Sequence, residues 1–401
     1  MRPTGIRRYS LALILFAFAN LMMGLYSGLY DPSFNNYLAQ VHNLSEVARG
    51  GLEFPRELPG FLVVVVFTAL LFLKDTRLAM LSALLVGISL WGQGFLAPNF
   101  HLVVFWMLMW STGAHLFMVM RSSLALRLAK KGQAGRILGQ IGGLEAAGIL
   151  LGSLLVYLGV SLFHFTFGTI FGIAGVCALL AAISLGLIKA EPIKRPERYL
   201  LLKRKYLLFY LLNMLFGARK QIFLTFAPWV LIHLFGQGVQ TFAILGLIGT
   251  SIGLFFRPLL GLAIDRIGER RIIFLESLIL VFICVLYAFA AQWFPVHIAL
   301  LVVMACFIAD QVLFAVNMAR VTYLNRIVDT PDDISPTISM GITLDHMISM
   351  TVPIGGGLLW AYCGYYWVFL AAALIALANL AASLYIPQFS PTPSEQQPQS
   401  A

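Results

Sequence analysis

Two cationic side chains, Arg219 and Lys220, interrupt an apolar stretch that runs from residue 206 to 233. A charge at the centre of a bilayer costs on the order of 3 kcal/mol, so such residues rarely face lipid. If the stretch is a helix, Arg219 lies about 20 Å from its first residue. A guanidinium group offers a bidentate fork for a carboxylate or a phosphate. The pair therefore indicates either an anion-binding site or structural ion pairs with acidic neighbours, and the sequence leaves both open.

Acidic and imidazole side chains in other apolar stretches could interact with Arg219 and Lys220. Asp310 lies in the stretch 297–319, and the neighbours Asp345 and His346 lie in the stretch 335–361. Glu145 occupies a depth in an earlier stretch that matches the depth of Asp345. Intramembrane Asp, Glu and His side chains often carry protons. We therefore predict proton coupling at Asp310 and Asp345, with His346 and Glu145 as further candidates; alternatively, the two aspartates only neutralise the two cations.

The stretch from residue 100 to 126 adds a histidine and a tryptophan. His115 lies at a depth comparable with Asp310, and Trp110 precedes it on the same stretch. We expect His115 and Trp110 to join Arg219 and Lys220 in binding a substrate. The alternative for Trp110 is simple packing or anchoring at the membrane interface.

The stretch from residue 47 to 73 holds Glu53, Arg56 and Glu57 close to two prolines. Prolines free backbone carbonyl groups, which is tolerated where protein or water covers them. This segment could form an outer vestibule. The favoured interpretation is a helix that starts partly exposed at the outer face.

The composition identifies the solvent around these charges as lipid. Of 401 residues, 60% are apolar and only 11% are charged, whereas soluble domains carry roughly 25% charged residues. A membrane helix needs about 20 apolar residues, and we predict an all-α membrane protein with twelve transmembrane helices. The expected spans are 9–29, 47–73, 78–97, 100–126, 136–160, 163–188, 206–233, 239–260, 271–292, 297–319, 335–361 and 365–386.

Basic residues fix the expected orientation because they mark the cytoplasmic ends of short links. They gather at the N-terminus and in links 74–77, 127–136, 189–205, 257–271 and 320–326. These are alternate links, so both termini should be cytoplasmic in a multi-pass protein of the plasma or inner membrane. The net charge of +10 then reflects topology, and a nucleic-acid partner is not indicated.

One long basic link divides the chain into two halves. Residues 189–205 combine two prolines with seven basic residues and separate six spans from six. We therefore predict two six-helix pseudo-repeats, 1–188 and 206–386, around a central pathway. The tail, 387–401, is rich in Pro, Ser and Gln and is predicted to be a disordered cytoplasmic segment.

A loop motif between the eighth and ninth spans identifies a family resemblance. Its candidate gating residues are Gly261, Asp265, Arg266, Gly268, Arg270 and Arg271. The order resembles the G-x-x-x-D-R-x-G-R-R signature of the major facilitator superfamily, except that Glu269 stands where a basic residue is usual. The resemblance implies a gate at this loop and a cavity lined by the first, fourth, seventh and tenth spans. The alternative is that these charges only orient the helices.

Regularly spaced glycines predict close contacts between helices. They are Gly135, Gly139, Gly143, Gly148 and Gly152 in the fifth span and Gly249 and Gly253 in the eighth. The resemblance implies that the fifth and eighth spans meet between the two halves, and we expect the glycines to serve that contact.

These observations predict a secondary active transporter that moves a small polar or anionic organic solute by alternating access, coupled to protons. No phosphate-binding G-x-x-x-x-G-K-[ST] spacing is present, and we expect no enzymatic activity and no cofactor. The four scattered cysteines support neither a metal site nor a disulfide framework. The expected partners are the solute, H⁺ and the lipid bilayer, with no obligate protein partner. The alternatives are a non-transporting membrane sensor or scaffold and, on weaker grounds, a membrane-embedded lipid enzyme.

Overall fold

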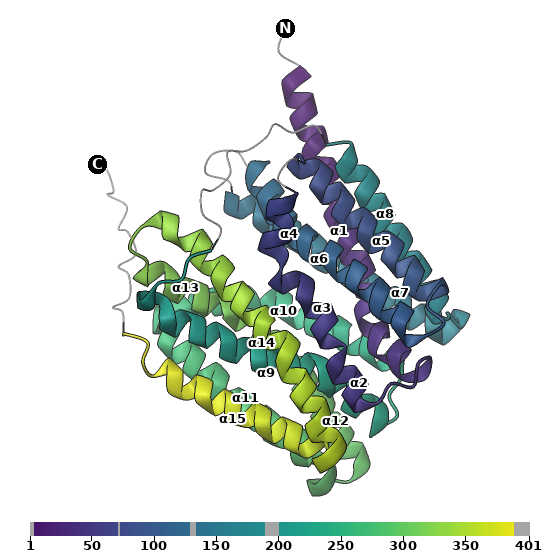
Figure 1. Ribbon diagram of the computed structural model, residues 1–401, viewed down its shortest axis with the longest axis vertical. Coiled ribbons are helices and arrows are strands. Elements are labelled where there is room, and N and C mark those ends of the chain that lie inside the picture. Colours follow the sequence, from purple (N-terminus) through teal and green to yellow (C-terminus); the bar gives the residue numbers. More distant parts are fainter. Residues whose placement is uncertain (1–3, 71–72, 129–133, 189–199, 389–401) are drawn as a thin grey trace.

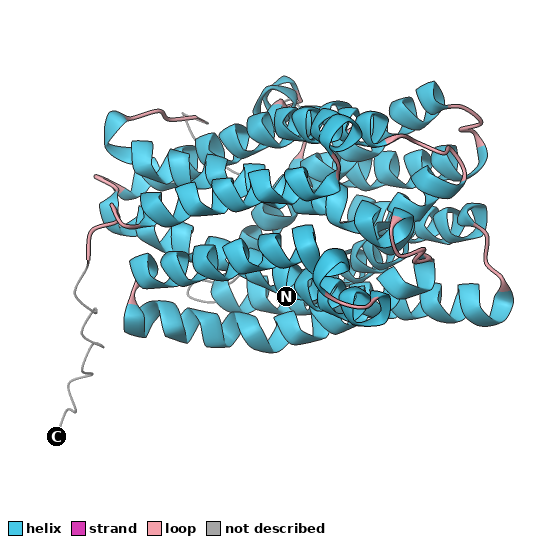
Figure 2. Ribbon diagram, turned by 90° about the horizontal axis from the view of Figure 1, so that it is seen from below, coloured by secondary structure: helices cyan, strands magenta, loops and turns pink. Residues whose placement is uncertain are grey.

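The computed structural model describes residues 4–70, 73–128, 134–188 and 200–388, and these residues form helices and short connections without a strand (Figure 2). The first half, residues 4–188, contains α1 (Thr4–Gln40), α2 (Glu46–Gly51), α3 (Glu53–Phe61), α4 (Val63–Ala69), α5 (Asp75–Phe95), α6 (Phe100–Arg127), α7 (Ala134–Phe163) and α8 (Phe167–Gly186). The second half, residues 200–388, contains η1 (Arg204–Tyr206), α9 (Leu207–His233), α10 (Val239–Ile267), α11 (Glu269–Trp293), α12 (Val296–Leu313), η2 (Phe314–Val316), α13 (Asn317–Ile327), η3 (Pro331–Asp333), α14 (Ile334–Cys363) and α15 (Tyr365–Ser383).

Ten helical segments of the described chain are long and apolar enough to cross a membrane. One of them joins α12, η2 and α13 into a single segment, Val296–Ile327. The two remaining predicted spans correspond to α2–α4 and to α14, so the arrangement is compatible with twelve spans. The start of α1 and the end of α15 lie at the same end of the bundle (Figure 1). The all-α membrane fold is thereby confirmed.

The second predicted span, 47–73, is three short helices rather than one. The breaks fall at Leu52 and Leu62, between α2, α3 and α4. Pro55 stands in the first turn of α3, where a missing N–H is tolerated, but Pro59 stands inside it and removes a helical hydrogen bond. Proline and glycine therefore divide a segment that its apolar residues alone predict as continuous.

The first helix is longer than its apolar run predicts. The predicted span ends at residue 29, whereas α1 continues to Gln40 and contains Pro32. The continuation carries Asp31, Asn35 and Asn36, which lie beyond the predicted span. Its inner side faces protein and a cavity instead of lipid, so polar residues are tolerated within the helix.

Each half is built around a cluster of buried apolar side chains, and the first cluster also includes Trp229, Val239 and Ala243 of the second half. In the first half α1 packs on α7 and α8, and α5 packs on α6 and α8; in the second, α9 packs on α14 and α15, and α11 packs on α15. The halves meet where α7 contacts α10 and where α2 and α3 contact α14. The predicted division at 189–205 stays a prediction, because residues 189–199, like the tail residues 389–401, lie outside the described part.

The α7 glycines do not all serve the contact that the sequence predicted. The fifth and eighth predicted spans do meet, as α7 and α10. Gly148 and Gly152, however, lie against the backbone of α1 within the first half, near Leu25 and Gly28. Positions 139 and 143 of α7 face open space. The small residues of α7 therefore bring two helices of the same half close together.

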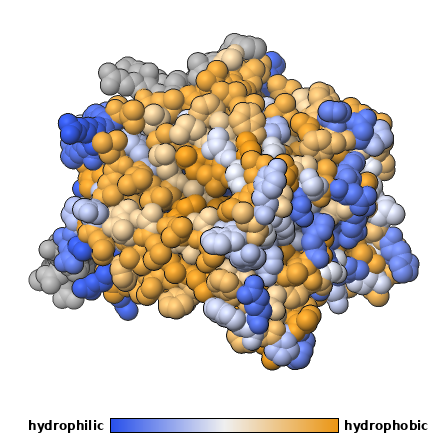
Figure 3. All heavy atoms as spheres, turned by 60° about the horizontal axis from the view of Figure 1, so that its bottom comes forward, coloured by the Kyte–Doolittle hydropathy of each residue, from blue (hydrophilic) through white to orange (hydrophobic). Residues whose placement is uncertain are grey.

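Apolar side chains cover much of the outer surface. Figure 3 shows hydrophobic residues spread over one face, with hydrophilic residues gathered toward its sides. Exposed side chains such as Phe255, Leu259, Phe282 and Leu301 belong to α10, α11 and α12. A soluble protein rarely exposes so much apolar surface, and in a bilayer these side chains contact lipid tails.

Candidate functional site

A cavity of about 380 Å³ lies between the two halves. The first half contributes side chains of α1, α3 and α7, and the second half contributes α9, α10, α12 and η2. Its charged wall residues are Asp31, Arg56 and Asp310, and aromatic rings such as Tyr30 and Phe223 complete the wall. Charged groups and rings that converge on a cavity from several helices can bind a small solute and fix its orientation.

Asp31 is a cavity residue that the sequence analysis missed. It is exposed although α1 runs through the protein interior, because its side chain faces the cavity. Ser27, one helical turn earlier, donates a hydrogen bond of 2.5 Å to its carboxylate. Asn35, one turn later, also lines the cavity. The spacing of Ser27, Asp31 and Asn35 is the signal that could have revealed a polar face on a continuing helix.

Arg219 forms an ion pair with Asp310, which joins α9 to α12. Their side chains are only 3% and 4% exposed. The guanidinium carbon lies 5.6 Å from the ring centres of both Phe223 and Phe314, so its charge is shielded from lipid. Asp310 also reaches the cavity wall, whereas Arg219 is not among the described residues that line it. Asp310 therefore lies at the cavity wall, and its partner Arg219 lies away from it.

Lys220 contacts a different acid on a different helix. Its ammonium nitrogen lies 2.7 Å from a carboxylate oxygen of Asp345 on α14. Ser349 donates a second hydrogen bond, of 3.3 Å, to the same carboxylate. Arg219 and Lys220 therefore point in different directions, as their adjacency predicts, and the geometry matches the neutralising alternative for both aspartates.

A buried charge network occupies α2 and α3. The carboxylate of Glu53 contacts Arg49, lies 3.0 Å from Arg56, and accepts a hydrogen bond of 2.6 Å from Gln221 on α9. Arg49 also donates to Asn35 on α1, at 3.0 Å. Arg49 and Glu53 are fully buried, so the expectation of a partly exposed helix start is wrong for Glu53. The bond between Glu53 and Gln221 joins the two halves.

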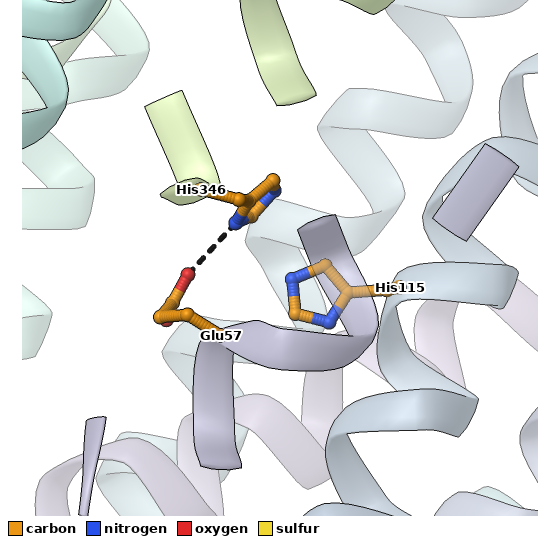
Figure 4. Close-up of side chains that lie close together, drawn as sticks. All are labelled: Glu57, His115 and His346. Atoms are coloured by element: carbon orange, nitrogen blue, oxygen red, sulfur yellow. Dashed lines mark hydrogen bonds and ion pairs between the residues drawn. The ribbon is translucent and has the colours of Figure 1, made fainter. Parts of the chain in front are cut away.

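A second polar contact between the halves involves Glu57, His115 and His346 (Figure 4). A carboxylate oxygen of Glu57 on α3 lies 2.8 Å from Nδ1 of His346 on α14. His115 on α6 approaches from the side, with its ring centre 4.8 Å from that of His346 and the rings nearly perpendicular. The sequence identified both histidines as site candidates and Glu57 only as part of a possible vestibule, and it did not predict that the three converge.

The remaining predicted site residues lie outside the cavity wall. Glu145 on α7 pairs with Arg121 on α6, and both side chains are about one-third exposed. Trp110 is buried beneath the cavity wall, with its ring 4.8 Å from that of Tyr30 and 5.9 Å from the guanidinium carbon of Arg56. Trp110 can therefore position two wall residues without touching the cavity itself.

The predicted gating loop joins α10 to α11. Gly268 adopts φ = 85° there, a conformation that suits glycine, while Asp265 and Arg266 are exposed. Glu269, which replaces the usual basic residue, is buried and lies 2.6 Å from Arg326 at the end of α13. The departure from the signature thus provides an ion pair between α11 and α13. The other gating residues, Gly261, Arg270 and Arg271, belong to the same two helices.

Comparisons with known proteins agree with this arrangement. The sequence matches a family profile described as Major Facilitator Superfamily over residues 16–342, and no curated protein matches it in sequence. In structure it is similar to the nucleoside transporter NupG, with a TM-score of 0.75, 12% identity, and coverage of 94% of this chain and 100% of that chain.

Two further solved structures share the architecture. A D-xylose-proton symporter has a TM-score of 0.69 and 17% identity, covering 94% of this chain and 98% of that chain. A bacterial homologue of the human lysosomal transporter Spinster, inward-facing and occupied, has a TM-score of 0.68 and 16% identity, covering 94% and 96%. At these identities the likeness shows the fold alone.

Proposed function

Because the chain belongs to the major facilitator superfamily, we propose that it is a secondary transporter that carries a small polar organic solute by alternating access, coupled to protons. The family and the solved neighbours identify a multi-pass membrane transporter and not an enzyme. The observation that supports the finer proposal is the cavity between the halves, with Asp31 and Asp310 on its wall.

The wall of the cavity favours a polar solute over an anion. It carries two carboxylates and one guanidinium group, Arg56, and that group already lies 3.0 Å from Glu53. Arg219, which the sequence offered as the anion site, is paired behind Asp310. Aromatic rings on the wall supply flat apolar surfaces beside these polar groups. A nucleoside or a sugar fits this chemistry, and the structurally similar proteins include a nucleoside transporter and a D-xylose-proton symporter.

Proton coupling is proposed at Asp310, with Asp31 as its partner across the cavity. Asp310 is the acid that both holds a buried cation and reaches the solute space. Its protonation would release Arg219, and its deprotonation would restore the pair. Asp345 and Glu145 are paired with Lys220 and Arg121 away from the cavity wall, so they rank below Asp310 as carriers.

The test is uptake into proteoliposomes of labelled nucleosides, sugars and organic anions, with and without an inward proton gradient. Asp31→Asn and Asp310→Asn should each lower gradient-driven uptake at least about tenfold, because a neutral amide cannot exchange a proton. Asp332→Asn is the matched control, since Asp332 is exposed outside the helical spans.

Three results would contradict parts of this proposal. Unchanged uptake and pH dependence in both cavity variants would remove the proton role. Uptake of anions alone would replace the polar solute. Binding of a solute without flux would identify a sensor instead of a carrier.

A further inference from the structure

We propose that Glu57, His115 and His346 form a binding site for a divalent transition-metal ion of the zinc class, and that the bound ion bridges the two halves. One candidate ligand atom of each residue lies within 4.8 Å of the others. Two imidazoles and a carboxylate are a ligand set that Zn²⁺ prefers, and three protein ligands leave one position open.

The present spacing is close to what a metal ion requires. Zinc–ligand bonds of about 2 Å in tetrahedral geometry place ligand atoms about 3.3 Å apart. Glu57 and His346 already approach to 2.8 Å, and His115 lies across from both, as Figure 4 shows. Small rotations of the side chains would bring all three to one ion, which would displace the proton shared by Glu57 and His346.

The neighbours of His115 orient it as a metal ligand. Its Nδ1 lies 2.9 Å from the carbonyl oxygen of Ser111. A carbonyl group only accepts, so Nδ1 carries the proton and Nε2 keeps its lone pair. A metal-binding histidine commonly has its other ring nitrogen fixed in this way by a backbone carbonyl.

Space beside the two rings depends on Gly60 of α3. A Cβ atom at this position would lie 2.6 Å from Nε2 of His115 and 2.7 Å from Nδ1 of His346. The two candidate nitrogens therefore face the same small region, and glycine keeps it free of a side chain.

The surrounding charges leave Glu57 available to a cation. Among the described ion pairs, Glu57 contacts His346 and no Lys or Arg. The nearest basic residues in sequence, Arg56 and Arg49, both contact Glu53. The site thus offers one carboxylate charge and two lone pairs to an incoming ion.

A metal ion at this site would link the two halves of the protein, because its ligands come from both. Glu57 and His115 belong to α3 and α6, and His346 belongs to α14. An ion held by all three would resist the separation of α3 from α14 and would stabilise the conformation described here.

Metal binding is tested on the purified full chain, freed of ions by a chelator, with Zn²⁺, Co²⁺ or Mg²⁺ added. Zn²⁺ at a hundred times its dissociation constant should raise the melting temperature by about 3 °C, and Mg²⁺ should not. Co²⁺ should give the visible absorption bands of a four-coordinate nitrogen–oxygen site. His115→Ala and His346→Ala should each weaken binding by at least about 100-fold, since a second-shell partner alone contributes 10–100-fold.

The matched control is His297→Ala, which removes an exposed histidine from α12. His115→Ala keeps the test decisive if His346→Ala fails to fold, since it leaves the contact between Glu57 and His346 in place. Equal Zn²⁺ affinity in the wild type and in His115→Ala would overturn the proposal, as would an equal response to Mg²⁺. A solute transport assay is not needed for either outcome, so failure here is distinguishable from failure of the proposed transport function.

Discussion

Arg49, Arg219 and Arg320 are almost completely buried, and each contacts a carboxylate. Inside a bilayer a charged side chain has no water to solvate it. A paired carboxylate therefore compensates the cost of placing the arginine within a transmembrane helix. The Arg320 pair lies on the cytoplasmic side in the predicted orientation, where a basic residue reads as a simple topology signal. The contact with Glu276 shows that it is part of the interior packing.

Removing one member of the Arg320–Glu276 pair should be costly. The pair joins α13 to α11 at 2.8 Å with both side chains buried. Arg320→Met leaves Glu276 uncompensated and should lower the free energy of unfolding by about 3–5 kcal/mol, measured by denaturation in detergent micelles. Combining it with Glu276→Leu should recover most of the loss.

The control for that prediction is an ion pair at the surface. Lys205 contacts Asp329 with both side chains about half exposed, and Lys205→Met should change stability by less than about 1 kcal/mol. Equal losses for Arg320→Met and Lys205→Met would contradict the assigned role of burial.

At the scale of elements, α7 presents different glycines to different surroundings. Gly148 and Gly152 lie against α1, where Gly24 and Gly28 bring its backbone equally close. Gly139 and Gly143 belong to the same helix but face open space. The same residue type thus has two structural consequences on one helix, and sequence spacing does not distinguish them.

Alanine substitutions in α7 should separate these two groups. A Cβ at Gly148 would lie 2.7 Å from the backbone nitrogen of Leu25, and one at Gly152 would lie 2.9 Å from the backbone of Gly28. Gly148→Ala and Gly152→Ala should each destabilise the protein by about 1–3 kcal/mol through overpacking.

Gly139→Ala and Gly143→Ala are the matched controls on that helix and should not lower the free energy of unfolding, because the higher helix propensity of alanine should raise it by up to about 1 kcal/mol. Thermal unfolding of the four variants in one detergent measures both effects. A similar loss at all four positions would contradict the assigned role of the contact with α1, because helix propensity alone favours alanine over glycine at each position.

At the scale of the whole molecule, the halves are in contact along α2, α3 and α14. Gly50 lies against the backbone at Pro353, and Gly357 lies against the backbone at Glu46 and Val47. Under the proposed alternating access, this contact would form in one state and loosen in another. Close backbone approach makes the contact sensitive to a single methyl group.

Gly357→Ala should shift the population away from the closed α2–α14 contact, since a Cβ there would lie 2.6 Å from the carbonyl oxygen of Glu46. Spin labels at Val41 and Tyr362, both exposed and on opposite halves, should report a longer mean distance. Gly355→Ala is the control on the same helix, because a Cβ at that position meets no atom within 4 Å. Identical distance distributions in the two variants would refute the sensitivity of this contact.

The sequence predicts the spans well because a lipid-facing helix must be apolar over about 20 residues. It fails where a helix faces protein or a cavity. Asp31 and Asn35 lie beyond the predicted first span although they continue α1, and Glu53 is predicted at a partly exposed helix start although it is buried.

The sequence does not predict which charged residues form ion pairs, for a different reason. Arg219 and Asp310 are 91 residues apart, and Lys220 and Asp345 are 125 apart. Both cations and both acids could be identified as intramembrane charges. Which acid meets which cation depends on how α9 turns toward α12 and α14, and no local pattern records that rotation.

The charge network of α2 and α3 has a consequence for the synthesis of the chain. Gln221, which bonds Glu53, follows it by 168 residues, and His346 follows Glu57 by 289. At about 5–20 residues per second, a ribosome needs about 15–60 s to deliver the last of these partners. During that interval the segment carries acidic groups whose hydrogen-bond partners in the second half have not yet been synthesised. Each of these charges opposes the release of the segment into lipid. We therefore expect the segment to stay at the insertion machinery or against the first-half helices until α9 and α14 arrive.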